Sequence, residues 1–238
     1  MPLADQRTDG LYTGIRQKFG QQNAGANGYQ MSAFFRREQA LLYSFLRPND
    51  FPLLDVACGS GLMLAPSLGN GAEVIGVDFN QQACVDARNN GLKVLRGDAF
   101  ELPFADQTMA QVVNCQFLNQ QSAADTQRFI SEVARVLKPG GQLVLFWRHA
   151  ESVFHRLAGT LIRASERMSG APVFPQFTHP MAEIETLMTA SGLVVVERAV
   201  SVPFGYPRQL RPSRFAARVI GASLVLVAER PAERGDSD

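Results

Sequence analysis

The sequence contains little cysteine, almost no net charge and no apolar run long enough to cross a membrane. Its three cysteines lie in or beside apolar runs without metal-ligand spacing, so we expect free, buried thiols in a reducing compartment and no metal site. The net charge of +1 provides no broad attraction for nucleic acid or an anionic membrane. The first ten residues lack the order of a signal peptide. Together these absences favour a cytoplasmic protein that binds neither nucleic acid nor a membrane.

The chain is long enough for one domain of the larger α/β kind. Hydrophobic residues make up 46% of the 238 residues, which suffices for a full core. We therefore predict a single domain over residues 1–238. Residues 1–30 are polar and rich in glycine, and they predict a loose arm. Residues 33–47 carry an apolar stripe at helical spacing, so the N-terminal part, 1–48, is expected to end in a cap helix.

An apolar run that ends in a glycine-rich turn is the most informative local feature. Residues 53–61 read LLDVACGSG, and the apolar residues 62–64 follow at once. This pattern predicts a buried strand that feeds a helix through a tight loop. Gly59 and Gly61 have no Cβ, so the backbone can adopt unusual angles and a ligand can approach closely. The helix end behind such a loop suits a carboxylate or a phosphate, although the glycines could also serve the turn alone.

Strands and helices alternate at short spacing after this loop. Such alternation predicts an α/β fold with a Rossmann-like, doubly wound parallel sheet, in which ligands bind at the carboxyl ends of the strands. Asp78, Asp98 and the segment Asn114–Gln116 all fall at strand ends, and Asp55 lies inside the first strand. We expect these side chains to lie along one edge. The further strands are predicted over 73–78, 92–95, 111–115 and 142–147, and the helices over 81–89 and 121–137.

Four stretches resemble the class I S-adenosylmethionine-dependent methyltransferases, and in particular the small-molecule group that includes the ubiquinone and menaquinone biosynthesis methyltransferases. They are LLDVACGSG, VIGVDFN, GDAFELPF and ISEVARVLKPGGQLVLFW, in the family's order and spacing, over about residues 50–148. A weaker match, GLVVVERAV followed by ASLVLVAERP, suggests a closing strand pair within 193–229. The resemblance implies a seven-stranded, mostly parallel sheet with an antiparallel C-terminal strand. It also implies S-adenosyl-L-methionine as cofactor, bound by residues 50–148.

The resemblance implies roles for residues at matching positions. The Asp55–Gly61 loop, with Ala57 in it, would hold the amino acid end of the cofactor. Asp78 would accept hydrogen bonds from both ribose hydroxyls, which suits a group with two acceptor oxygens, and Phe79 follows it at the same edge. Arg36, or Arg37 beside it, could pair with the cofactor carboxylate.

The other end of the cofactor is assigned in the same way. Asp98 would accept from the adenine amino group, with the backbone N–H of Ala99 at the ring. Asn114 and Cys115 would line the sulfonium side. One departure from the family pattern is Gln111, because an acidic residue commonly opens this strand.

The transfer of a methyl group from a sulfonium is an in-line displacement, in which the protein chiefly aligns donor and acceptor. An oxygen or an acidic carbon acceptor also needs a base. His149, at the end of the fifth predicted strand, is the preferred candidate, and a surface histidine is the alternative. Tyr29 and Tyr206 could serve as well, and the sequence does not rank them.

The segment after the fifth strand predicts the character of the substrate. Residues 150–180 carry an apolar stripe, which indicates either an inserted lid with an apolar inner surface or plain core packing. A lid favours a small, mostly apolar metabolite, with an oxygen, carbon or nitrogen acceptor. The arginines of 208–218 could meet an anionic group or form a solvated loop, and the tail, 230–238, is expected to fray. The oligomeric state stays open.

Two other functions share parts of this pattern. An NAD(P)-dependent oxidoreductase on a Rossmann fold needs G-x-G-x-x-G, and the third glycine is replaced by Leu64 here. A catalytically inactive module that binds S-adenosylmethionine would keep the same loop and carboxylates. We expect an S-adenosylmethionine-dependent methyltransferase that acts on a small molecule.

Overall fold

The computed structural model describes residues 33–64, 73–149, 151–153, 177–201 and 223–232. The predicted arm, most of the predicted lid and tail, Tyr29, Tyr206 and the arginines of 208–218 lie outside these residues. The described elements are α2 (Ala33–Phe45), β1 (Leu53–Val56), β2 (Val74–Asp78), α3 (Gln81–Asn89), β3 (Lys93–Arg96), β4 (Met109–Cys115), the 3₁₀ helix η4 (Leu118–Gln120), α4 (Ala123–Val136), β5 (Leu137–Arg148), α6 (Met181–Ala190), β6 (Val194–Ser201) and β7 (Ser223–Glu229).

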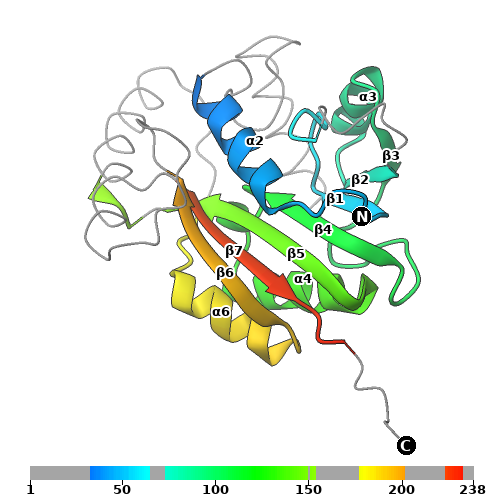
Figure 1. Ribbon diagram of the computed structural model, residues 1–238. Helices are drawn as coiled ribbons and strands as arrows, with labels where there is room; N and C mark the ends of the chain where they lie inside the picture. Colours follow the sequence, from blue (N-terminus) through cyan, green and yellow to red (C-terminus); the bar gives the residue numbers. More distant parts are fainter. Residues whose placement is uncertain (1–32, 65–72, 150, 154–176, 202–222, 233–238) are drawn as a thin grey trace, which may run out of the picture.

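The strands form one seven-stranded sheet in the order β3-β2-β1-β4-β5-β7-β6 (Figure 1). Strand β7 runs antiparallel to both of its neighbours, and the other described pairs are parallel. The strand order reverses between β1 and β4, which is where doubly wound sheets bind their ligands. The predicted fold, a mostly parallel sheet closed by an antiparallel C-terminal strand, is confirmed.

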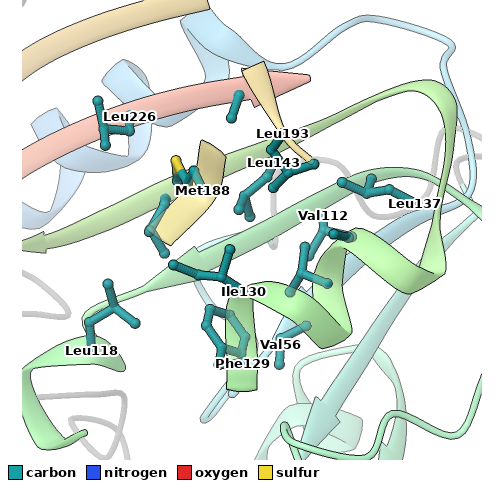
Figure 2. Close-up of a cluster of buried hydrophobic side chains, with 14 of the residues drawn as sticks. Val56, Val112, Leu118, Phe129, Ile130, Leu137, Leu143, Met188, Leu193 and Leu226 are labelled. Carbon is teal, nitrogen blue, oxygen red and sulfur yellow. The ribbon is translucent and has the colours of Figure 1, made fainter. Parts of the chain in front are cut away.

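Helices pack on both faces of the sheet. On one face, the apolar sides of α4 and α6 meet the central strands (Figure 2). Helix α4 begins at Ser122, whose hydroxyl accepts a hydrogen bond from the Asp125 N–H at 3.2 Å, and it buries Phe129, Ile130 and Val133 completely. On the other face, α2 and α3 contribute side chains to a second buried cluster. The two apolar layers hold the sheet in the interior, so a ligand can reach it only at its edges.

Residues 138–141, whose proline and glycines predict a turn before the strand expected over 142–147, do not form one. In the structure α4 ends at Val136 and the strand begins at Leu137, so these four residues belong to β5. The Gly140 N–H donates to the Arg230 carbonyl at 2.8 Å, and the Arg230 N–H donates to the Gly141 carbonyl at 2.9 Å. The proline and glycines, which usually indicate a turn, are here kept in the sheet by pairing with the end of β7.

Gln111 secures α2 at the amino edge of the sheet. Its side chain is 1% exposed. The oxygen accepts hydrogen bonds from the Arg47 N–H at 2.8 Å and the Gln142 amide at 2.7 Å. The amide donates to the Asp50 carbonyl at 2.5 Å and, at 3.0 Å, to the Arg47 carbonyl just after α2. Gln142 donates in turn to the Phe45 carbonyl at 3.0 Å, so the two amides satisfy backbone groups at the C-terminal end of α2.

We expect Gln111→Leu to lower the free energy of unfolding by about 2–4 kcal/mol, because it leaves buried donors and acceptors without partners. Denaturant unfolding measures the change, and the matched control is Gln81→Leu at an exposed position at the start of α3. Equal stability of the two variants would contradict this account of Gln111.

Candidate functional site

The loop after β1 turns sharply at the carboxyl edge of the sheet. Ala57, Gly59 and Gly61 all have positive φ angles, at 55°, 55° and 73°. The Gly61 N–H donates to the Cys58 carbonyl at 2.9 Å and closes the turn. A Cβ at Gly61 would lie 2.8 Å from Cδ2 of Leu92. Glycine at position 61 therefore permits both the left-handed backbone and close packing against the residue that precedes β3. The helix predicted behind the loop falls mainly in residues 65–72, outside the described ranges.

Asp78 joins this loop to the end of β2. Its Oδ2 accepts a hydrogen bond from the Gly59 N–H at 2.8 Å, and its Oδ1 accepts from the Asn80 N–H at 2.9 Å. The Asn80 side chain caps α3 by accepting from the Ala83 N–H at 2.8 Å. The Asp78 carboxylate is therefore held in a fixed orientation between the loops after β1 and β2.

Two buried acceptors on adjacent strands lie next to this loop. Asp55 in β1 is 2% exposed, and its Oδ2 finds no hydrogen-bond donor among the described residues. Asn114 in β4 is fully buried; its amide donates to the Val56 carbonyl at 2.8 Å, but its Oδ1 also has no donor in the described part of the chain. Because an unsatisfied buried acceptor is costly, such groups in a native fold call for an explanation.

The surroundings of Asp55 change its protonation. Burial, and secondarily the nearby Asp78 carboxylate, raise the pKa of Asp55 to about 8. At neutral pH most molecules therefore carry a protonated, neutral Asp55. A cationic group placed beside it would favour the charged carboxylate instead.

The third carboxylate lies one strand further toward the edge of the sheet. Asp98 follows β3 and is exposed, and its Oδ1 accepts from the Phe100 N–H at 2.9 Å. The adjacent Gly97 N–H donates to the Asp78 carbonyl at 3.0 Å, which links the loops after β2 and β3. Ala99 is buried beside it. Asp55 inside β1, Asp78 at the end of β2 and Asp98 after β3 thus belong to three neighbouring strands, as the sequence predicts.

Phe79 contacts Arg96, whereas Arg36 is exposed on α2. The Phe79 carbonyl accepts from Nε of Arg96 at 3.0 Å, and the guanidinium lies 5.7 Å from the centre of the Phe79 ring. Arg36 lies on α2 with an exposed side chain, and its role stays a prediction. Gln39 of α2 reaches the glycine-loop region, where its amide donates to the carbonyls of Leu62 at 2.9 Å and Met63 at 3.2 Å. Nothing in the sequence pattern singles out Gln39.

The strand ends on the other side of the switch point hold Cys115 and His149. Burial, with the Asp55 and Glu38 carboxylates, raises the pKa of the Cys115 thiol well above its usual value, so it is neither charged nor nucleophilic. His149 follows β5 directly and is 6% exposed. Its predicted role as a base stays untested. His179 is also buried, and its Nε2 lies 2.9 Å from the Gln121 carbonyl, which ties it to the end of η4.

The core of the chain resembles known protein families. Residues 54–145 match the family model described as a methyltransferase domain. The core of the chain is similar to a methyltransferase domain. A solved S-adenosylmethionine-dependent methyltransferase from Thermotoga maritima, described as a possible histamine N-methyltransferase, has the same fold. The TM-score is 0.62 at 20% sequence identity, and the match covers 82% of this chain and 88% of that chain. Magnesium protoporphyrin IX methyltransferase from Synechocystis with bound S-adenosylhomocysteine also has this fold. Its TM-score is 0.66 at 14% sequence identity, and the match covers 96% of this chain and 98% of that chain.

A curated relative is similar over a longer stretch of the chain. Demethylmenaquinone methyltransferase from Bacillus licheniformis is 30% identical over 148 residues, or 59% of this chain. The match spans 62% of that relative's length. The predicted resemblance to menaquinone methyltransferases is confirmed, and the solved structures agree with S-adenosylmethionine as the cofactor of the fold.

We expect Asp55→Asn to remove a pH-dependent loss of stability from the protein. In the unfolded chain Asp55 loses its proton near pH 4, whereas the folded protein keeps it up to about pH 8. The wild type therefore loses stability between these values, by at most about 1.4 kcal/mol per pH unit from this group.

The free energies of unfolding of wild type and Asp55→Asn, measured without ligand, should diverge in favour of the variant from pH 5 to 8. The curves should run parallel above pH 9. The control Asp50→Asn, at a side chain 41% exposed, should follow the wild type throughout. Parallel curves for Asp55→Asn between pH 5 and 8 would show that Asp55 ionises normally.

Proposed function

We propose that this protein transfers a methyl group from S-adenosylmethionine to a small, mostly apolar metabolite. The observation that carries the proposal is the pair of buried acceptors, Asp55 and Asn114, beside the glycine loop. S-adenosylmethionine brings both an ammonium group and a sulfonium charge, so it offers the donors and the positive charge that these two side chains lack. The residues present therefore fit the cofactor.

The remaining site residues suit the other parts of the same molecule. The Ala57–Gly61 backbone would hold the amino acid end, and Asp78, already fixed by two N–H donors, would accept the ribose hydroxyls. Asp98 and Ala99 would bind the adenine, and Cys115 would lie on the sulfonium side. When bound, the cofactor supplies an electrophilic methyl group, and the task of the protein is to align it with the acceptor and to exclude water.

Two features support the choice of substrate and compartment. The curated relative is named for demethylmenaquinone, a small molecule, which favours a metabolite as the acceptor. All three cysteines are free thiols, as expected of a protein in the reducing cytoplasm. No helix in the described ranges is long and apolar enough to span a bilayer. An NAD(P)-dependent oxidoreductase is not favoured, because Leu64 stands where its fingerprint needs a third glycine.

We expect S-adenosylmethionine and S-adenosylhomocysteine, but not NADH, to bind in a calorimetric titration. Asp78→Asn should weaken binding by about 1–3 kcal/mol, because it replaces a charged hydrogen-bond acceptor with a neutral one of the same shape. The control Asp106→Asn changes a carboxylate paired with Arg135 away from the loop and should bind normally. Undiminished binding by Asp78→Asn would remove Asp78 from the site.

Turnover separates an enzyme from an inactive binding module. Incubation of the protein and S-adenosylmethionine with a metabolite extract should produce a species heavier by about 14 daltons, the mass of CH₂, in the apolar fraction. Binding without any such product would favour the inactive module, whereas products confined to hydrophilic acceptors would contradict the apolar substrate.

A further inference from the structure

A buried polar cluster near the proposed cofactor site contains none of the residues assigned to the cofactor. Its centre is Glu38 of α2, which is 3% exposed. Oε1 of Glu38 accepts hydrogen bonds from the hydroxyls of Ser201, at 3.2 Å, and Ser223. The Ser223 hydroxyl also accepts from the amide of Gln116 at 3.0 Å. The cluster therefore joins α2, the end of β6 and the start of β7 to the first residue after β4.

The sheet register places this cluster at the same edge as the cofactor residues. Ser201 and Ser223 are paired across β6 and β7, and Ser223 pairs with Arg148, the last residue of β5. Gln116 follows Cys115, which ends β4 and lies on the proposed sulfonium side. The cluster thus lies at this edge on the β5–β7–β6 side of Cys115, away from Asp55 in β1. Under the proposed function, this is the side left for the acceptor substrate.

The electrostatics of Glu38 suit proton transfer. Burial raises the pKa of Glu38, and the hydroxyls of Ser223 and Ser201 and the charge of Arg148 oppose that rise. Two ionisable groups in the described structure interact with the charge of Glu38. Arg148 of β5 lowers the pKa of Glu38, and the Glu38 carboxylate raises the pKa of Cys115 in β4. A carboxyl with a raised pKa is a stronger base than one in water, and it can work near neutral pH.

A purely structural role explains the cluster less well. Two serine hydroxyls need only a neutral acceptor, and an amide in place of the carboxyl would avoid the cost of burying a charge. Within the described residues, moreover, both serine hydroxyls donate to the same oxygen of Glu38, Oε1. A buried carboxyl held through one oxygen is suited to take a proton from a bound ligand.

We propose that Glu38 is the proton acceptor in methyl transfer, and that the substrate therefore carries an ionisable hydroxyl, of a phenol or an enol. The inference rests on the proposed function and names the substrate class of that site. Glu38 takes the hydroxyl proton, and the electron pair left on the substrate forms the new bond to the methyl carbon. The carbon–sulfur bond breaks with its pair on sulfur, so the carboxylate and sulfonium charges both disappear. Where a conjugated carbon is methylated, that carbon's own proton restores the hydroxyl.

The test uses full-length protein, radiolabelled S-adenosylmethionine and a matched panel: phenol, 1-naphthol and 1-anthrol with their amino analogues. We expect transfer to hydroxyl members. Glu38→Gln keeps an acceptor oxygen for both serines, so S-adenosylhomocysteine binding should be unchanged while kcat falls about 100-fold or more. The rise of kcat with pH should also disappear. Ser201→Ala should instead shift that rise to higher pH, because the hydroxyl it removes lowers the pKa of Glu38.

Two controls make the result specific. Glu185→Gln changes a carboxylate on α6, on the opposite face of the sheet, and should leave kcat and its pH profile as in the wild type. His149→Gln tests the other candidate base. Transfer to the amines alone, or to no panel member, would overturn the inference. So would an unaltered pH profile of kcat in Glu38→Gln or, should that variant not fold, in Ser201→Ala. A pH profile that only His149→Gln abolishes would also overturn it. Failure of S-adenosylmethionine to bind the wild type would instead overturn the proposed function.

Discussion

The hydrogen bond from the Gly59 N–H to the Asp78 carboxylate is the contact on which the rest of the site depends. At 2.8 Å it joins the loop after β1 to the loop after β2. The Asp78 carbonyl extends the connection to the third strand end by accepting from the Gly97 N–H. Because β1, β2 and β3 are neighbours in a parallel sheet, these bonds set three loops at one edge in fixed relative positions. A ligand that spans the three loops therefore meets a surface already arranged for it, and little entropy is lost on binding.

The sequence predicted most of the fold because that information is local. Strands such as β1, buried on both faces, read as short apolar runs, and α4 reads as an amphipathic helix between a serine cap and the next strand. The strand-end positions of Asp78 and Asp98 follow from the same reading. The error at residues 138–141 has a clear cause: Gly140 is held by Arg230, about ninety residues away, and local turn propensity carries no trace of that partner.

The side chains that complete the site were harder to find because their partners are distant in sequence. Gln111 departs from the family pattern, in which an acidic residue commonly opens this strand, and the structure shows that it secures the end of α2 at the amino edge. Glu38 was missed although the sequence held a signal for it. It lies three and four residues from Phe34, Phe35, Leu41 and Leu42, so a carboxylate interrupts the apolar stripe of a predicted helix. A charge at such a position must be paired or functional, because burial without compensation is costly.

Helix α2 connects the two halves of the proposed chemistry. Its C-terminal end is secured at the amino edge of the sheet by Gln111 and Gln142. In the middle of the helix, Gln39 contacts the residues after the glycine loop, and Glu38 contacts the start of β7. Adjacent side chains on one helix thus contact the region that holds the cofactor and the region that receives the acceptor. Since both contacts are hydrogen bonds with strict geometry, a shift of α2 that weakened one would weaken the other. The proposed sites of cofactor binding and of proton removal are therefore linked through a single helix.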